Sequence, residues 1–313
     1  MQTLSVKVAE IRQITPVIRE FTFVPKGGEL PGFSAGSHVV VEVPVGDRRQ
    51  RNPYSLLGDP RDRSQYRIAV RRLDESRGGS QGMHANVEVG DELELSYPQN
   101  LFAPHSLAQH HALIAGGIGI TPFMSYVAEL EARGASFELH YAYRGGLTGA
   151  FLDDLHERMG EKLRTYDSNA GEQLDIAAVL GKQRLGAHLY TCGPPGLLQA
   201  VREQAAVLGW PAGRVHWEEF TAPEPGIPFV VELTRSGRRI EIPGDRSLLE
   251  TLEDEGVDID SGCRGGVCGA CKTRYTEGEV DHRDHFLTGD ERDSYLMPCV
   301  SRGCAERPLL LDL

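Results

Sequence analysis

Four cysteines carry the clearest chemical signal in this chain of 313 residues. Three lie in one short stretch, Cys263-Arg-Gly-Gly-Val-Cys268-Gly-Ala-Cys271, and the fourth is the more distant Cys299. A C-x4-C-x2-C group followed by a distant cysteine is the plant-type spacing, in which four thiolates hold a [2Fe–2S] cluster. A structural zinc site is the alternative, but zinc ligands usually come as two close pairs. We therefore predict that these four cysteines bind a cluster that carries single electrons.

The glycines of the same loop explain how a loop can hold an anionic cluster. Because glycine lacks a Cβ, the backbone can pass close to the cluster and turn its amide N–H groups toward it. Two nearby histidines, His282 and His285, resemble metal ligands, but cysteine already fills every cluster position. We interpret both histidines as packing or hydrogen-bonding residues, and we assign no chemistry to Cys304.

Two further glycine-rich loops each follow an expected strand. The first is Ala115-Gly116-Gly117-Ile118-Gly119-Ile120-Thr121-Pro122, between a strand over 111–115 and a helix over 121–130. The free amides and the dipole at a helix N-terminus favour a pyrophosphate group. The spacing is not G-x-G-x-x-G, so a tight structural turn is the alternative.

The second loop, Cys192-Gly193-Pro194, closes a later strand of the same expected sheet. Open α/β sheets bind ligands outside the carboxyl ends of their strands, so we expect both loops at one crevice. We interpret Cys192 as a small residue lining a nicotinamide site, because no His or Asp partner suggests a nucleophile.

A third candidate site lies nearer the start of the chain. Tyr54 and Ser55 end an expected strand, and such a pair can stack on a flavin ring and hydrogen-bond its polar atoms. Further on, Arg71 and the segment from Arg77 to Ser80 supply basic and amide donors that suit a phosphate monoester. An ordinary turn and a solvated run of arginines are the alternatives.

Three segments with different patterns are expected to position these sites. From Ser5 to about Tyr97, apolar and polar residues alternate as they do around Val41, and Gly and Pro mark the gaps. This pattern predicts a small antiparallel barrel. From about His110, strand runs alternate with helices, which predicts a parallel α/β sheet.

For two of the expected helices, the spacing of apolar residues predicts which face is buried. The helix over 121–130 should end at Gly134 and bury one face, made of Phe123, Tyr126, Val127 and Leu130. The helix over 195–208 should also bury one face, made of Leu197, Leu198, Val201 and Leu208.

A linker separates the last segment from the rest of the chain. Thr221 to Pro228 contains three prolines and one glycine, which make a semi-stiff spacer. After it, two strands and a short helix capped by Ser247 lead into the cluster loop. The predicted fold is multidomain α+β: an antiparallel β-barrel over 1–105, an α/β parallel-sheet domain over 106–222, a linker over 223–228 and the cluster domain over 229–313.

Composition narrows the partners and the compartment. A formal net charge of −12 argues against nucleic acid or an anionic membrane as a partner. No run of eighteen apolar residues is present, and the N-terminus lacks the regions of a signal peptide. Six cysteines, four of them committed to a cluster, indicate a reducing cytoplasm.

Taken together, these stretches resemble the phthalate dioxygenase reductase family along essentially the whole chain. The motifs that carry the resemblance occur in the family's order: Tyr54-Ser55, Gly78-Gly79-Ser80, Gly116 to Pro122, Cys192 to Pro194, His216-Trp-Glu-Glu-Phe220, the cluster loop and Asp281-His-Arg-Asp284. The spelling Asn52-Pro-Tyr-Ser-Leu-Leu57 is similar to the branch that contains carnitine monooxygenase reductase.

The resemblance implies an FMN-binding barrel, an NAD-binding α/β domain and a C-terminal β-grasp ferredoxin domain. The implied FMN residues are Arg51, Asn52, Tyr54, Ser55, Ala69, Val70, Arg71, Arg77, Gly78, Gly79 and Ser80. The implied NADH residues are Gly116, Gly117, Gly119, Thr121, Pro122, Cys192, Gly193 and Pro194, and Phe220 would lie against the flavin. No residue is expected to act as a catalytic acid or base.

One departure from the family's pattern concerns the flavin phosphate. The wider flavin-reductase superfamily has arginine two residues before the tyrosine, where this chain has Asn52, and Arg51 lies one position early. Arg71 and Arg77 are the expected substitutes.

The identities of the flavin and of the nucleotide are also expected from single features. A short Gly-Ser loop without an adenine-stacking aromatic favours FMN over FAD. Asp167 favours NADH over NADPH, and Arg144 is the residue that opposes this preference.

The implied function is that of an oxygenase reductase. NADH gives up two electrons as a hydride, a [2Fe–2S] cluster takes one at a time, and a flavin connects the two. The implied acceptor is a Rieske-type oxygenase, with a cytochrome P450 as the first alternative. A cluster-based redox sensor and a stand-alone NADH oxidase are further alternatives, and we expect a monomer.

Overall fold

The computed structural model describes residues 3–46, 48–74, 78–220 and 225–313, and these fall into two compact units that divide between residues 220 and 221. The predicted phosphate ligand Arg77 and linker residues 223 and 224 lie outside the described residues. Residues 225–228 have no regular secondary structure. The predicted boundary at 105/106 separates two parts of one compact unit, and it stays a prediction.

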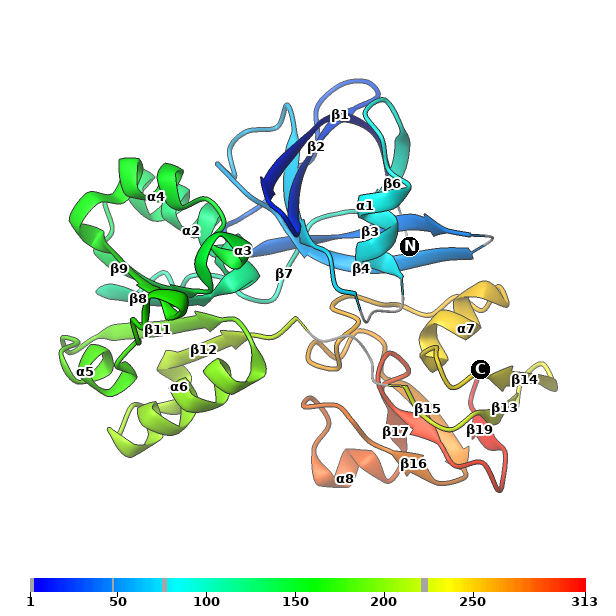
Figure 1. Ribbon diagram of the computed structural model, residues 1–313. Coiled ribbons are helices and arrows are strands. Elements are labelled where there is room, and N and C mark those ends of the chain that lie inside the picture. The colour runs from blue at the N-terminus through cyan, green and yellow to red at the C-terminus, as the bar shows by residue number, and fades with distance from the viewer. Residues whose placement is uncertain (1–2, 47, 75–77, 221–224) are drawn as a thin grey trace. The chain divides into compact units, whose positions relative to one another are not determined.

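The first part of the N-terminal unit is the predicted antiparallel barrel (Figure 1). Its elements are β1 (Thr3–Thr15), β2 (Ile18–Pro25), β3 (Ser37–Val45), β4 (Arg48–Ser55), β5 (Tyr66–Arg71), α1 (Gly79–Ala85), β6 (Glu92–Ser96) and β7 (Gln99–Asn100). The strands follow the order β4-β3-β6-β1-β2-β5, with β7 paired to β3. The Leu57 N–H donates to the Arg67 carbonyl at 2.8 Å and so links the two ends of this path.

The alternating residues of β3 and β5 explain why the barrel forms. Val39, Val41 and Val43 of β3 are fully buried, and so is Ile68 of β5 in the same core. Each such side chain contributes about 1.5–3 kcal/mol when it leaves water. Helix α1 was not predicted, and its Met83 packs into the same core.

The second part of the unit is a doubly wound parallel sheet. Its strands are β8 (His110–Gly116), β9 (Phe137–Tyr143), β10 (Leu163–Asp167), β11 (Ala187–Cys192) and β12 (Val215–Glu218), in the order β10-β9-β8-β11-β12. All four pairings are parallel. The helical segments are η1 (Gly117–Ile120), α2 (Thr121–Ala132), α3 (Gly145–Thr148), α4 (Leu152–Met159), η2 (Gly160–Lys162), η3 (Ser168–Ala170), α5 (Ile176–Gly181), α6 (Pro195–Val207) and η4 (Ala212–Arg214).

Helices cover both faces of this sheet. Helices α2 and α4 pack on one face with Leu113 and Leu139, whereas α5 and α6 pack on the other with Ile114 and Leu189 (Figure 1). This alternation explains why β8 and β11 are apolar on both sides. The predicted parallel sheet is confirmed.

Helix α2 agrees with its predicted face, and helix α6 agrees in part. All four predicted residues of α2 are buried, and Gly134 follows the helix with a φ of 61°. In α6, Leu198 and Val201 are buried, but the prediction for Leu208 is wrong because that side chain is 44 % exposed. The helix ends at Val207, and Leu208 lies at its C-cap, where the chain turns through Gly209.

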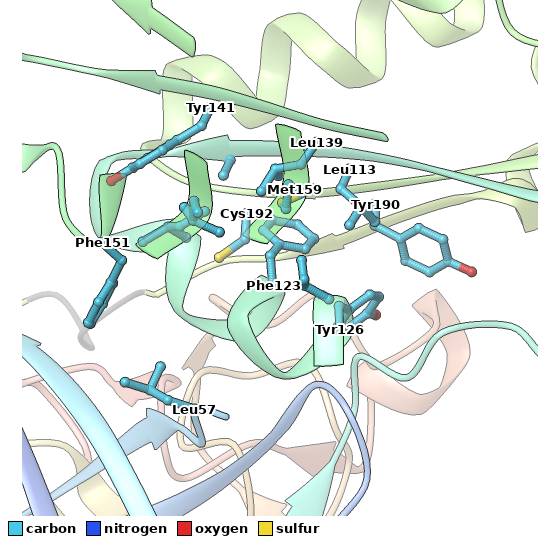
Figure 2. Packing of buried hydrophobic residues seen from close by; sticks show 14 of the residues in the cluster. Leu57, Leu113, Phe123, Tyr126, Leu139, Tyr141, Phe151, Met159, Tyr190 and Cys192 are labelled. Carbon is cyan, nitrogen blue, oxygen red and sulfur yellow. The ribbon is translucent and has the colours of Figure 1, made fainter. Parts of the chain in front are cut away.

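One apolar cluster joins the barrel to the sheet within the N-terminal unit. Leu57 of the barrel side belongs to the same buried cluster as Phe123 and Tyr126 of α2 and Tyr190 of β11 (Figure 2). The Tyr126 hydroxyl donates to the Phe102 carbonyl at 2.6 Å, so this buried hydroxyl is paired. This shared core explains why residues 2–220 form one compact unit.

The C-terminal unit contains a mixed sheet with one main helix. Its elements are β13 (Phe229–Leu233), β14 (Arg238–Ile242), α7 (Leu248–Asp254), β15 (Thr273–Glu277), β16 (Val280–Asp281), α8 (Gly289–Arg292), β17 (Tyr295–Leu296), β18 (Arg302–Gly303) and β19 (Leu309–Leu311). The order is β14-β13-β19-β15-β17, with β13 and β19 parallel, and β16 pairs with β18. Ser247 and Glu250 form a capping box at the start of α7, as the sequence predicts for Ser247.

Candidate redox centre

Two buried donors without a partner come from the neighbouring strands β4 and β5. Strands β4 and β5 are in contact, and β5 ends at Arg71 beside the buried Ala69 and Val70. Ser55 Oγ and Arg71 Nε are both inaccessible to solvent and have no hydrogen-bond partner among the described residues. A buried polar atom without a partner costs about 1–3 kcal/mol. A flavin fits this edge, because its ring and its phosphate offer acceptors to both donors.

A third unpaired group, which the sequence did not suggest, lies opposite Ser55. His38 of β3 pairs in register with Ser55, and its Nε2 is buried with no partner in the described part of the chain. Burial lowers the pKa of His38 to about 4. Burial also raises the pKa of the neighbouring Tyr54 to about 12, so both rings are neutral near pH 7. A lone histidine in a valine-rich strand gives no sequence signal.

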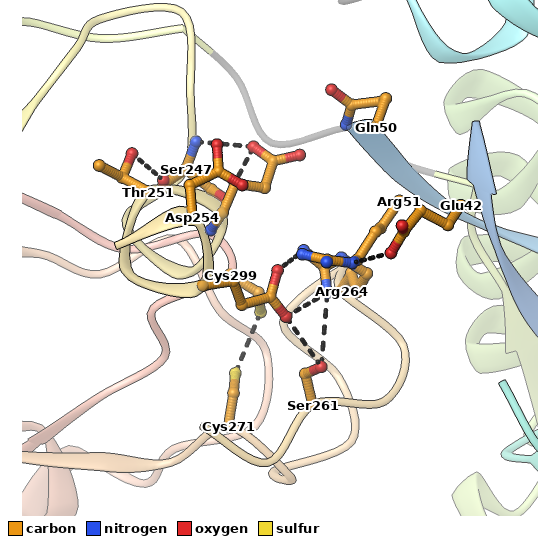
Figure 3. Close-up of polar contacts among 12 residues, drawn as sticks. Glu42, Gln50, Arg51, Ser247, Thr251, Asp254, Ser261, Arg264, Cys271 and Cys299 are labelled. Carbon is orange, nitrogen blue, oxygen red and sulfur yellow. Dashed lines mark hydrogen bonds and ion pairs between the residues drawn. The ribbon is translucent and has the colours of Figure 1, made fainter. Parts of the chain in front are cut away.

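Asn52 lies beside the Gly78–Ser80 segment. A Cβ on Gly79 would lie 2.2 Å from Asn52 Nδ2, so only glycine allows this contact. Asn52 Nδ2 also donates to the Tyr54 hydroxyl at 3.4 Å. Arg51 lies on the opposite face of β4, where its Nε is 2.9 Å from Glu42 Oε2 (Figure 3).

The two glycine loops of the parallel sheet pack directly against each other. A Cβ on Gly119 would lie 2.2 Å from the Cys192 carbonyl oxygen, and one on Gly116 would lie 2.7 Å from Pro194 Cδ. Gly117 has a φ of 53° and opens η1, and Thr121 and Pro122 then begin α2. The structure therefore brings both loops to the carboxyl ends of β8 and β11, as predicted, and explains the glycines by close packing.

A thiol and a carboxyl group end two neighbouring strands at this edge. Cys192 and Glu218 pair in register between β11 and β12, and the Cys192 side chain is fully buried. Glu218 Oε2 is inaccessible and has no partner among the residues described here. Burial raises the pKa of Glu218 to about 8, and burial followed by the Glu218 charge raises that of Cys192. Phe220, two residues beyond Glu218, is 47 % exposed and available to stack.

An acidic side chain is fixed at the far end of the same edge. Asp167 ends β10, and its Oδ1 accepts the N–H of Gly145 at 2.8 Å and the N–H of Asn169 at 2.9 Å. These two bonds hold the carboxylate between the loops that follow β9 and β10. The predicted opponent Arg144 precedes this loop as the N-cap of α3.

In the C-terminal unit the four predicted cluster cysteines lie in two pairs. Cys271 Sγ is 3.3 Å from Cys299 Sγ, and the Cys263 N–H donates to Cys268 Sγ at 3.4 Å. The hydrogen bond from the Cys263 thiol lowers the pKa of Cys268, and the one with Cys299 lowers that of Cys271. The same contacts raise the pKa of the other sulfur of each pair, Cys263 and Cys299.

The paired arrangement discriminates between a cluster and a zinc ion. Within the described ranges, no three His, Cys, Asp or Glu side chains converge as ligands of a single ion. A tetrahedral zinc site would need all four thiolates around one point, whereas a two-iron cluster takes two thiolates at each iron. The residues present therefore fit a [2Fe–2S] cluster.

Two loop glycines allow a second segment to cover the cluster loop. Gly266 and Gly269 have φ values of 76° and 77°. A Cβ on Gly269 would lie 2.2 Å from the Phe286 ring, and the His285 N–H donates to the Gly266 carbonyl at 3.0 Å. The His285 side chain itself is exposed, and the fourth cysteine, Cys299, is 1 % exposed.

The three parts together define a class of protein. A barrel edge that fits a flavin, a nucleotide edge on a parallel sheet and a four-cysteine loop are the components of an iron–sulfur flavin reductase. Within the described residues, no helix is long and apolar enough to span a bilayer.

Comparisons with known proteins agree with this class. Residues 231–304 match the family described as "2Fe-2S iron-sulfur cluster binding domain", and residues 96–215 match "Dimethylamine monooxygenase subunit DmmA-like, N-terminal domain". The chain is 56 % identical to the heme-dependent oxidative N-demethylase beta subunit of Ectopseudomonas mendocina over 99 % of both chains. It is 42 % identical to the carnitine monooxygenase reductase subunit of Escherichia coli, over 100 % of this chain and 99 % of that one.

A solved structure has a similar fold. Phthalate dioxygenase reductase, described as a modular structure for electron transfer from pyridine nucleotides to [2Fe–2S], superimposes with a TM-score of 0.88 at 38 % identity and covers 99 % of this chain and 98 % of its own. The chain belongs to the phthalate dioxygenase reductase family.

Membership confirms the predicted fold class and the predicted enzyme. The protein is a reductase component of a multicomponent oxygenase, and it passes electrons from NADH through a flavin to a [2Fe–2S] cluster. An electron-transfer enzyme is thereby favoured over the redox-sensor and NADH-oxidase alternatives.

Proposed function

We propose that the oxygenase served by this reductase is a haem-dependent oxidative N-demethylase, which acts on an N-methylated amine. The observation that carries the proposal is the 56 % identity, over 99 % of both chains, to the beta subunit of such an enzyme. The match of residues 96–215 to a dimethylamine monooxygenase subunit points to the same substrate class.

A Rieske-type oxygenase, as predicted from the sequence, is the second candidate. Its support is the 42 % identity to a carnitine monooxygenase reductase subunit and the 40 % identity to phthalate dioxygenase reductase of Burkholderia cepacia. The cytochrome P450 alternative is supported by a type IV self-sufficient P450 monooxygenase, 35 % identical with a TM-score of 0.75, of which this chain covers 41 %. That structure shows that the same reductase plan also serves a haem acceptor.

We propose that the flavin is FMN and that the barrel edge binds it. Tyr54 would stack on the ring, Ser55 and His38 would donate to its polar edge, and Arg71 would pair with the phosphate. Ala69 and Val70 would line the ring, while Asn52 and the segment Gly78–Ser80 would complete the phosphate site. Arg51 is left out of this set because it pairs with Glu42 on the opposite face. When bound, the flavin supplies a two-electron acceptor that releases electrons singly.

The nucleotide edge would bind NADH in a fixed orientation. The amides of Gly116 to Thr121 suit the pyrophosphate, and Gly193 and Pro194 close the site over Cys192. Glu218, protonated near pH 7, can donate a hydrogen bond into the site, and Phe220 would cover the flavin face. Asp167 would repel the additional phosphate of NADPH.

We further propose that Cys263, Cys268, Cys271 and Cys299 are the cluster ligands. The free state of all six cysteines among the described residues and the use of NADH fit a reducing cytoplasm. A monomer and the three-domain division at 105/106 and 222/223 remain part of this proposal.

The acceptor can be tested by reconstitution. The reductase, loaded with flavin and cluster, would be mixed with NADH and oxygen. The haem subunit of the E. mendocina demethylase would be added together with dimethylamine, or the oxygenase of the E. coli carnitine system together with carnitine. Oxidative N-demethylation releases formaldehyde. We expect the rate of NADH-dependent formaldehyde release with the haem subunit to be at least ten times the rate of carnitine turnover with the carnitine oxygenase. Faster turnover with the carnitine oxygenase would favour the second candidate.

A further inference from the structure

A buried ion pair lies inside the cluster loop. Arg264 directly follows Cys263 and has a φ of 54°, a left-handed conformation that residues with a side chain rarely adopt. Its side chain is 5 % exposed. The guanidinium donates to both carboxylate oxygens of Glu253, at 2.8 and 2.7 Å, and lies 3.4 Å from the Ser261 hydroxyl (Figure 3).

This pair connects the cluster loop to a helix. Glu253 is in the last turn of α7, so the bidentate contact fixes the loop against a regular element. The positive charge also lies near the C-terminal, partially negative end of that helix. A strained backbone persists only where such contacts over-determine it. The strain at Arg264 therefore indicates that the position of this charge is specified.

The backbone N–H groups on both sides of Arg264 donate to cysteine sulfurs. The Gly265 N–H donates to Cys263 Sγ at 3.4 Å, and the Cys263 N–H donates to Cys268 Sγ at 3.4 Å. Charges in a buried region act on one another more strongly than charges in water. Net charge and hydrogen bonds around an iron–sulfur cluster set its reduction potential.

We propose that Arg264 and Glu253 are positioning residues that set the reduction potential of the cluster through opposite charges, an inference that rests on the proposed ligand set. The positive charge of Arg264 favours the reduced cluster, which carries one more negative charge. The negative charge of Glu253 favours the oxidised cluster. Together they hold the potential between the values that either charge alone would give.

The test is an anaerobic redox titration of the full-length, cluster-loaded protein, followed by EPR. Glu253→Gln should increase the ratio of reduced to oxidised cluster at a fixed potential by about tenfold, which is a rise of about 59 mV for one electron. Arg264→Gln should decrease that ratio by a similar factor. The double variant should return to within a few-fold of the unmodified protein.

Two further variants separate charge from structure. Arg264→Lys keeps the charge and should leave the potential near its original value, even where cluster occupancy falls. Glu255→Gln removes a partner of Arg238 that is 50 % exposed at the end of the same helix, and it should not shift the potential.

Three outcomes would overturn the proposal: shifts of the same sign in both single variants, unchanged potentials with the cluster retained, or a double variant that moves as far as either single one. If Arg264→Gln cannot be loaded, Glu253→Gln still decides the sign of the charge effect, and a potential shifted in Arg264→Lys would show that more than the charge of Arg264 matters. A failure of the ligand assignment itself would look different, because the unmodified protein would then give no cluster signal after reduction with dithionite.

Discussion

Cys192 and Glu218 stand opposite each other in the register of β11 and β12, at the edge where the two glycine loops meet. The thiol is fully buried and one carboxyl oxygen is inaccessible without a partner in the described part of the chain. A carboxyl group in such a place is stable only when protonated. The nucleotide edge of the sheet therefore carries a protonated, neutral carboxyl group that can donate a hydrogen bond.

Replacement of Glu218 by Gln should remove a pH dependence of stability. Because burial raises the folded-state pKa from 4.5 to about 8, the native protein holds a proton that the unfolded chain has lost. Stability therefore falls as pH rises from about 4.5 through 8. Thermal unfolding, followed by flavin release, should show the variant gaining about 1–3 kcal/mol, or about 2–8 °C in Tm, relative to the unmodified protein between pH 5 and 8.5.

The matched control for this change is Glu219→Gln, at the neighbouring half-buried position. It should keep the pH dependence of the unmodified protein. An equal pH dependence in Glu218→Gln would show that Glu218 is ionised in the folded protein.

Substitution of Cys299 by Ser should separate the two halves of the electron path. The thiolate of this 1 % exposed residue cannot be replaced by another described cysteine, since Cys304 contacts Glu279 instead. The variant should lose the cluster absorption and at least nine-tenths of oxygenase-coupled turnover, while NADH still bleaches the flavin at the original rate. Cys304→Ser is the control and should keep both, and a normal cluster in Cys299→Ser would remove this residue from the ligand set.

The contact between Asn52 and Gly79 should determine flavin affinity. A methyl group at position 79 would displace Asn52, because the added Cβ would lie 2.2 Å from its Nδ2. We expect Gly79→Ala and Asn52→Ala each to raise the Kd for FMN by about 10- to 100-fold, the effect of losing a hydrogen bond to a charged group. Fluorescence titration of the flavin-free protein measures this directly.

Two controls accompany the FMN titration. Gly27→Ala adds a methyl group where nothing lies within 4 Å, and it should leave the Kd unchanged. Arg51→Gln should also have little effect on the Kd, because Arg51 pairs with Glu42 on the opposite face. If Arg51→Gln lowers the affinity for FMN more than Asn52→Ala does, Arg51 and not Asn52 binds the phosphate.

Asp167 should set the preference between NADH and NADPH. Its carboxylate is fixed by two backbone N–H groups at the carboxyl end of β10, near the expected ribose. Asp167→Asn removes the charge that would repel a 2′-phosphate, so kcat/KM for NADPH should rise relative to NADH by about tenfold. Asp153→Asn, at an exposed position of α4, should leave the ratio unchanged, and an unchanged ratio in Asp167→Asn would place the ribose elsewhere.

The sequence predicted those parts of the fold in which local pattern and tertiary packing agree. The buried face of α2, the parallel sheet and the cap at Ser247 all follow from periodicity and end signals that their neighbours reinforce. The prediction that Leu208 is buried was wrong because periodicity does not say where a helix stops. Helix α1 was missed because three of its seven residues are glycine or serine, which do not favour helices.

The candidate site was less predictable, because side-chain direction decides it. Arg51 and Asn52 are neighbours in sequence, yet strand geometry sends them to opposite faces, and only the contact with Gly79 shows which one faces the loop. His38 and Glu218 have no motif that distinguishes them from other polar residues at strand positions. Their buried, unpaired atoms become visible only when the strands are assembled.

The most direct test of the central claim is an anaerobic titration of the loaded protein with NADH, followed by visible absorption and low-temperature EPR. We expect bleaching of the flavin together with a rhombic one-electron cluster signal, complete at about 1.5 equivalents of NADH, because flavin and cluster together take three electrons. Bleaching of the flavin with a cluster that stays oxidised would contradict electron transfer from NADH through the flavin to the cluster.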